Sequence, residues 1–155
     1  MAAQPIPEGY FGLIPSLIVD DAERAIEFYK RAFGGTERSR MPGPGGTIAH
    51  AELEIAGSVL MLHDPFPHSS LKPPKELGGT AVGVFLYVDD VDETIQQAID
   101  AGAKVVMPVE DQFWGDRYGT VADPFGHEWQ FATHTQDLTP EEIAERGREA
   151  MASLG

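Results

Sequence analysis

The hydrophobic positions of the chain follow a strand period and then a helix period, and they do so twice. Residues 13–19 (LIPSLIV) form a short apolar run that predicts a strand, after which apolar residues recur at helical spacing up to Phe33. The pair Asp20-Asp21 can cap this helix, and Gly34-Gly35 can end it. Three more strands are then expected, over residues 36–41, 47–55 and 58–64.

The same order of elements begins again after residue 80. Residues 81–88 predict a strand, Asp89-Asp90 predicts a helix cap, and Gly102 ends that helix. Further strands are expected in KVVMPVEDQ, WGDRYGTVAD and HEWQFATH. The stretches LIVDDAERAI at 17–26 and LYVDDVDETI at 86–95 therefore share one pattern, in which an apolar strand leads through Val-Asp-Asp into a helix. This pattern indicates a duplicated βαβββ unit.

The remaining segments connect and extend the two units. The connector carries four prolines and no hydrophobic period, and Thr139, Pro140 and Glu142 predict a capped helix in the tail. The expected organisation is an N-terminal extension at 1–12, a first module at 13–64, a connector at 65–80, a second module at 81–134 and a C-terminal helix at 135–155.

Composition narrows the possible partners. The chain has 155 residues, a net charge of −14 and no cysteine. The acidity disfavours nucleic-acid and anionic-membrane binding, and the absence of cysteine excludes disulfides and thiolate metal sites. No apolar run is long enough to span a bilayer, and the N-terminus shows no export signal. We therefore expect a cytoplasmic protein that has no nucleic-acid or membrane partner.

The chain resembles the vicinal oxygen chelate superfamily, which is the glyoxalase/bleomycin-resistance/dioxygenase group. The resemblance spans residues 10–134 and rests on LIVDDAERAIEFYKRAFGG, YVDDVDETIQQAIDAGA and DPFGHEWQF. Within the superfamily the phrases HAELEIAGSVLMLHD, FWGDRYG and DPFGHEWQFATH are similar to the PhnB-like branch. The resemblance implies an α+β fold in which two tandem βαβββ modules form a cupped, open mixed sheet, with a C-terminal helix added. It also implies a homodimer.

At the positions where the superfamily binds its metal, this chain has few side chains that could act as ligands. Metal-using members place one ligand on the first and last strand of each module. The resemblance puts these positions at Ile14, Gly83 and Gln130, with Met61 or His63 as the fourth. Isoleucine and glycine side chains have no donor atom, and the remaining set is weak. We therefore predict a metal-independent protein that has no cofactor and binds a small organic ligand.

A metal-dependent alternative stays open at this point. His63, His50, Glu52 or Gln130 could hold a divalent ion for a lyase, isomerase or dioxygenase reaction. The row that contains His50 and Glu52 is nevertheless expected to face solvent, as Glu54 in the same row suggests. His134 could lie at the cavity rim or equally on the surface. Whether the protein is an enzyme is not decided by these residues, and no catalytic residue is assigned.

The ligand pocket is predicted from the two-residue period of the strands, which places every second residue on the side away from the helices. In the FWGDRYG stretch, Arg117 could clamp a carboxylate or phosphonate beside Trp114 and Tyr118. Alternatively, Trp114 fills the core and Arg117 pairs with Asp116, Asp123 or a nearby glutamate. The predicted ligand-binding residues are Ser16, Met61, His63, Phe85, Tyr87, Trp114, Arg117 and Gln130.

Overall fold

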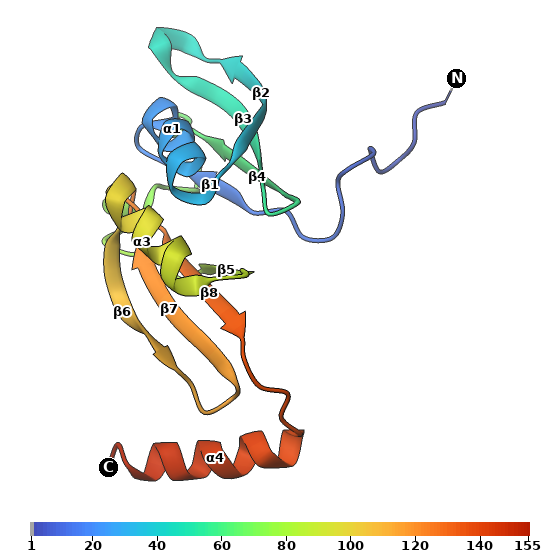
Figure 1. Ribbon diagram of the computed structural model, residues 1–155. Helices are drawn as coiled ribbons and strands as arrows, with labels where there is room; N and C mark the ends of the chain where they lie inside the picture. Colours follow the sequence, from blue (N-terminus) through green and yellow to red (C-terminus); the bar gives the residue numbers. More distant parts are fainter. Residues whose placement is uncertain (1) are drawn as a thin grey trace.

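Two βαβββ modules and a C-terminal helix make up the fold in the computed structural model, which describes residues 2–155 (Figure 1). Residue 1 of the expected N-terminal extension lies outside the described residues. The first module contains β1 (Ser16–Ile18), α1 (Ala22–Phe33), β2 (Thr36–Pro42), the 3₁₀ turn η1 (Pro44–Gly46), β3 (Ile48–Ile55) and β4 (Ser58–His63). After a short helix α2 (Pro74–Leu77), the second module contains β5 (Gly83–Tyr87), α3 (Val91–Ala101), β6 (Lys104–Asp111), β7 (Asp116–Ala122) and β8 (Glu128–His134). Helix α4 (Pro140–Ala152) follows, and the predicted fold class is confirmed.

Each module folds its four strands into a mixed sheet. The strand orders are β1-β4-β3-β2 and β5-β8-β7-β6. In each sheet the first and last strands pair in parallel, with Ser16 beside Met61 and Phe85 beside Gln130, and the other neighbours are antiparallel. This topology explains why residues far apart in the sequence meet on one face of each sheet.

Helices α1 and α3 pack against each other and cover one face of each sheet (Figure 1). The Asp21 carboxylate caps α1 by accepting from the Arg24 backbone N–H, and Gly34 ends it at a φ of 64°, which glycine adopts without strain. Phe28 and Tyr29 of α1 enter the common core together with Trp129. The opposite face of each sheet, turned away from these two helices, is called the open face below.

Asp123 joins the two modules from the turn between β7 and β8. Its buried carboxylate accepts hydrogen bonds from Tyr29 Oη at 2.6 Å and Trp129 Nε1 at 3.0 Å, and from two backbone N–H groups of its own turn. His127 of the same turn donates from Nε2 to the Ile18 carbonyl oxygen at 2.9 Å. The second module is therefore bonded to both the helix and the first strand of the first module.

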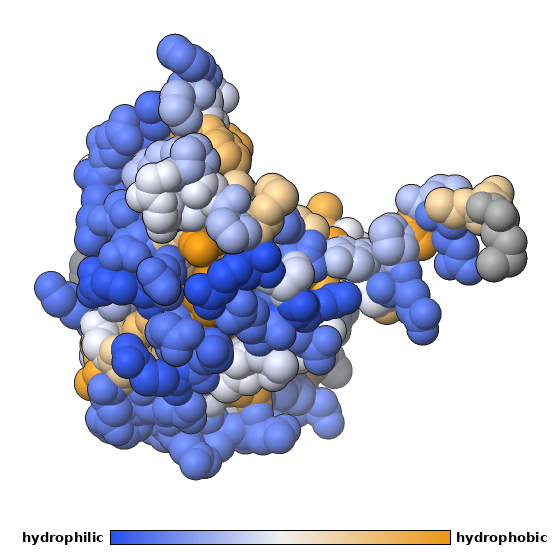
Figure 2. Space-filling model, turned by 90° about the horizontal axis from the view of Figure 1, so that it is seen from above, coloured by the Kyte–Doolittle hydropathy of each residue, from blue (hydrophilic) through white to orange (hydrophobic). Residues whose placement is uncertain are grey.

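Three segments differ from, or add to, the sequence-based expectations. The connector holds the one-turn helix α2, which starts at Pro74 and is too short to produce a hydrophobic period. Strand β1 begins only at Ser16, because Pro15 has no N–H to give to a neighbouring strand. The N-terminal arm, residues 2–12, projects from the body of the protein (Figures 1 and 2). Among residues 2–155, no helix has the length and apolar character needed to cross a bilayer.

Candidate functional site on the open faces

Four aromatic side chains lie together on the open face of the second module. Phe85 and Tyr87 come from β5, Tyr118 comes from β7, and Trp114 precedes β7. The rings of Phe85 and Tyr118 are nearly parallel, at 19°, with centroids 6.2 Å apart, and Trp114 meets Tyr118 edge-on at 5.7 Å. Ala132 of β8 is in register with both Tyr87 and Tyr118, so a small residue separates the rings on this face.

Asp116 fixes the orientation of this aromatic group. The carboxylate is 3% exposed and accepts from Tyr87 Oη at 2.9 Å and Trp114 Nε1 at 3.0 Å. His134 Nδ1 donates to its other oxygen at 2.7 Å, while His134 Nε2 donates to Asp137 at 2.9 Å. The Asp116 and Asp137 carboxylates raise the pKa of His134, and Asp116 also raises the pKa of Tyr87. Fixed aromatic faces of this kind suit contact with a planar molecule.

Gln130 lies on the same face and uses the space that Gly83 leaves free. A Cβ atom added at Gly83 would lie 2.7 Å from Gln130 Nε2 and 3.1 Å from its Cδ. The Gln130 amide therefore lies over the β5 backbone, and any side chain at position 83 would displace it. Positions 83 and 130, where metal-using relatives would carry ligands, thus hold a glycine and an amide side chain that lies over it.

A groove runs between the edge strands β1 and β5 of the two modules. Its volume is about 440 Å³, and Ile14, Ser16, Gly83 and Phe85 contribute to its walls. A second hollow, lined by Trp129 and Phe85 among others, continues it toward the β3–β4 turn. Volumes of this size accommodate small organic molecules.

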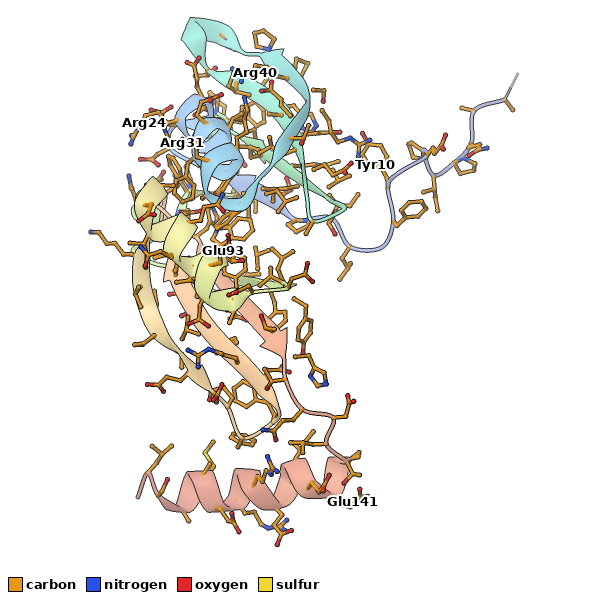
Figure 3. All side chains as sticks on the ribbon, viewed as in Figure 1. Tyr10, Arg24, Arg31, Arg40, Glu93 and Glu141 are labelled. Carbon is orange, nitrogen blue, oxygen red and sulfur yellow. The ribbon has the colours of Figure 1, made fainter. Side chains whose placement is uncertain are left out.

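The open face of the first module carries a compact polar group. Tyr10 reaches from the N-terminal arm (Figure 3) and donates to Glu52 Oε2 at 2.5 Å. His50 Nε2 donates to Glu52 Oε1 at 3.0 Å. These two hydrogen bonds, with His50 the larger influence, hold the pKa of Glu52 below its usual value. Arg38 lies over the Tyr10 ring, with Cζ 4.8 Å from the centroid. Glu52 is consequently buried, so the interpretation of its row as a solvent-facing one is wrong for this residue.

Of the predicted site residues on the first module, Ser16 and Met61 lie side by side, and His63 makes other contacts near them. Ser16 and Met61 are in register, and Met61 also lies opposite Glu52 on β3, so these side chains share the open face. His63, at the end of β4, makes a 2.7 Å hydrogen bond from Nδ1 to the Asp64 carbonyl oxygen and stacks on Phe66 at 4.7 Å. His63 therefore does not join His50 and Glu52.

Arg117 lies away from the aromatic group with which the sequence grouped it. Its neighbours on β7, Asp116 and Tyr118, occupy the open face, and alternation along the strand places Arg117 on the helix side. There the guanidinium makes a bidentate ion pair with Asp92 of α3, at 2.6 and 2.9 Å, and a 3.3 Å contact with Asp111. The alternative interpretation, in which Arg117 forms an ion pair, is correct in kind, but its partners are Asp92 and Asp111 and not Asp116, Asp123 or a glutamate.

The donor set at the superfamily's metal positions does not fit a divalent ion. Ile14 and Gly83 have no donor, and Gln130 is the amide described above. Within residues 2–155, no three histidine, aspartate or glutamate side chains converge as a metal site requires.

Comparison with known proteins identifies the family of the chain. A family model for the Glyoxalase/Bleomycin resistance protein/Dioxygenase superfamily matches residues 12–131, and the chain belongs to that superfamily. Protein Mb0911c of Mycobacterium bovis is 47% identical over 146 residues, covering 92% of this chain and 93% of its own.

Solved structures show the same fold. TioX from Micromonospora sp. ML1 is 31% identical with a TM-score of 0.63, covering 80% of this chain and 98% of its own. The Arabidopsis thaliana product of At5g48480 is 30% identical with a TM-score of 0.65, covering 79% and 98%. A PhnB protein from Bacillus cereus (TM-score 0.61, covering 79% and 99%) and FosX from Listeria monocytogenes with Mn(II) (TM-score 0.60, covering 86% and 96%) share the fold at 20% and 18% identity. The resemblance to the superfamily is confirmed, and the assignment to its PhnB-like branch stays a prediction.

Sequence reasoning missed three residues of these faces as site residues, Tyr10, Asp116 and Thr120, and it named Tyr118 only as a neighbour of Arg117. All but Tyr10 could have been found, because DRYGTVA is a strand and its two-residue period puts Asp116, Tyr118 and Thr120 on one face. Tyr10 had no such signal, since only the path of the arm brings it to Glu52.

Proposed function

We propose that the protein binds a small planar organic molecule at the open face of the second module and the adjoining β1–β5 groove. The main support is the group of aromatic side chains, of which Phe85 is 44% exposed and Tyr87 is 59% exposed. A soluble surface rarely leaves aromatic rings uncovered and clustered unless they contact a partner or ligand. Asp116 holds Tyr87 and Trp114 in place, so the surface is ordered before a ligand arrives.

We also propose that binding needs no metal ion. The donor chemistry supports this proposal, because the expected ligand positions carry isoleucine, glycine and an amide. The rival function, a divalent-metal lyase, isomerase or dioxygenase, would need His63 to join His50 and Glu52. Its hydrogen bond to the Asp64 carbonyl oxygen argues against that arrangement. The fold itself is neutral on this question, since FosX carries Mn(II) on the same fold.

The protein is further proposed to act as a homodimer. Phe11 and Leu13 of the N-terminal segment are exposed, as are Val105, Val106 and Met107 on the edge strand β6. Exposed apolar side chains on an arm and on an edge strand are surfaces that a second copy can cover.

The proposal is tested with metal-free protein and a panel of small planar aromatic compounds. After dialysis against EDTA and elemental analysis, at least one compound is expected to raise the melting temperature by several degrees, because ligand binding stabilises the folded state in proportion to RT ln(1 + [L]/Kd). Phe85→Ala should remove that shift, since it deletes one of the two parallel rings. Arg117→Met is the matched control and should keep it, because Arg117 lies on the helix side.

Two results would contradict the proposal. One is that no compound shifts the melting temperature of well-folded protein. The other is that a stoichiometric Ni²⁺, Zn²⁺, Mn²⁺ or Fe²⁺ ion remains bound and a chelator abolishes ligand binding.

A further inference from the structure

The hydroxyl of Thr120 is the one buried side-chain polar atom within residues 2–155 that has no hydrogen-bond partner. Thr120 is 4% exposed and lies in the middle of β7. The large majority of buried side-chain polar atoms in native proteins have a hydrogen-bond partner, so an unpaired one calls for an explanation. Valine has the same shape and suits a strand equally well, which means that the fold gains nothing from the hydroxyl.

The position of Thr120 connects this orphan atom to the proposed ligand site. Thr120 lies directly opposite Gln130 in the β7–β8 register, and residues paired in this way have Cβ atoms about 5 Å apart on the same face. Gln130 is in turn the neighbour of Phe85 on β5, and Tyr118 precedes Thr120 by two residues on β7. The Thr120 and Gln130 side chains therefore share the open face with Phe85 and Tyr118, and the Gln130 amide lies over Gly83 on the β5 side.

The chemistry of the pair defines what it can recognise. A hydroxyl and a carboxamide can each donate and accept a hydrogen bond, and neither carries charge. Glu128 shares the open face, beside Gly83 in the β5–β8 register, and together with burial it raises the pKa of Tyr118. An anionic group would meet this carboxylate, whereas the Arg117 guanidinium is held on the opposite face by Asp92.

We propose that Thr120 and Gln130 are the polar recognition pair of the ligand site and that they select a neutral planar aromatic carboxamide or lactam. The aromatic rings contact the planar part of the ligand, and the hydroxyl and amide hydrogen-bond its adjacent carbonyl and N–H groups. The Gln130 amide reaches its position over β5 because Gly83 beneath it has no side chain to displace it. This inference rests on the proposed function and adds the chemical class of the ligand.

The test compares three probes that share one ring system: 2-naphthamide, 2-naphthoate and naphthalene, each titrated calorimetrically into the full-length protein. The wild type is expected to bind 2-naphthamide at least tenfold more tightly than either of the others. Thr120→Val and Gln130→Met should each weaken 2-naphthamide binding about tenfold, the size expected for one buried hydrogen bond, and should leave naphthalene within about twofold. Thr36→Val, at an exposed position on β2, is the control and should change neither affinity.

A stability measurement separates recognition from a structural role. Thr120→Val should melt at the same temperature as the wild type or higher, because it removes an unpaired buried hydroxyl. A clear fall in melting temperature would mean that the fold uses the hydroxyl and would overturn the inference. Two binding results would also overturn the inference: an unchanged 2-naphthamide affinity in Thr120→Val, or equal affinities of the wild type for 2-naphthamide and naphthalene. In the second case, naphthalene binding that is abolished by Phe85→Ala would still support the proposed function. Failure of all three probes to bind would count against both.

Discussion

Replacing Asp123 by asparagine tests the connection between the two modules. One carboxylate oxygen accepts from the Phe125 and His127 backbone N–H groups, at 2.9 Å each. The other accepts from Tyr29 Oη at 2.6 Å and Trp129 Nε1 at 3.0 Å. Asparagine keeps the shape but turns one of these oxygens into an NH₂ group. Whichever way the amide is oriented, two of the four donors lose their acceptor and face another donor.

The magnitude follows from that count. A hydrogen bond lost in a buried site costs about 1–3 kcal/mol, so two of them lower the free energy of unfolding by about 3 kcal/mol. This is a large share of the total for an ordinary domain, which is about 5–15 kcal/mol. For a chain of this length it corresponds to a fall in melting temperature of about 6–12 °C. The exposed Asp89 provides the matched control, and Asp89→Asn is expected to change stability by less than about 0.5 kcal/mol.

Urea unfolding at neutral pH, followed by far-UV circular dichroism, measures both variants. The reasoning requires Asp123→Asn to shift the midpoint while the slope stays near the wild-type value. Tyr29→Phe should reproduce part of the loss, because it removes one of the four donors and leaves the carboxylate with three. If Asp123→Asn is within about 1 kcal/mol of the wild type, the carboxylate does not hold the modules together as its hydrogen bonds imply.

Two other predictions concern pH and assembly. His134 has a raised pKa, so its contacts with Asp116 and Asp137 contribute fully below about pH 6.5 and are lost as the pH rises through the folded-state pKa. The stability advantage of the wild type over His134→Asn, measured by urea unfolding, should accordingly be larger at about pH 6 than at about pH 9; an advantage that does not change with pH would refute this. If the proposed homodimer forms, light scattering at micromolar concentration should give the mass of two chains. The double variant Phe11→Ser, Leu13→Ser should shift that mass toward one chain. A wild-type chain that is monomeric throughout that range would contradict the dimer.

Much of the fold was readable from the sequence because local chemistry specifies it. The caps at Asp21 and Asp90, the glycine ends of α1 and α3 and the capping box of Thr139 and Glu142 all occur where the pattern placed them. These signals act within a few residues, so one sequence is enough to read them. The repeated order of elements then predicted two similar sheets, and the structure has them.

The site could be read only in part. Phe85, Tyr87 and Gln130 were predicted correctly to share a face, because the period of a strand and the pairing of first with last strands fix it. Arg117 was grouped with Trp114 because FWGDRYG was interpreted as one aromatic stretch, whereas β7 begins at Asp116 and alternation separates the neighbours. The ion pair with Asp92 depends on where α3 crosses the sheet, which no local pattern records.

The sequence by itself determined the two modules, their helix ends and the lack of metal donors at the expected positions, since each of these depends on nearby residues or on residue type alone. Tertiary structure decided which polar groups form hydrogen bonds: Tyr10 bonds to Glu52, and Tyr29 bonds to Asp123. It also left the Thr120 hydroxyl without a partner among residues 2–155. The two hydrogen bonds join residues 42 and 94 positions apart. Their partners are set by packing of the complete chain, because hydrogen bonds depend on distances of a few tenths of an ångström that sequence spacing does not encode.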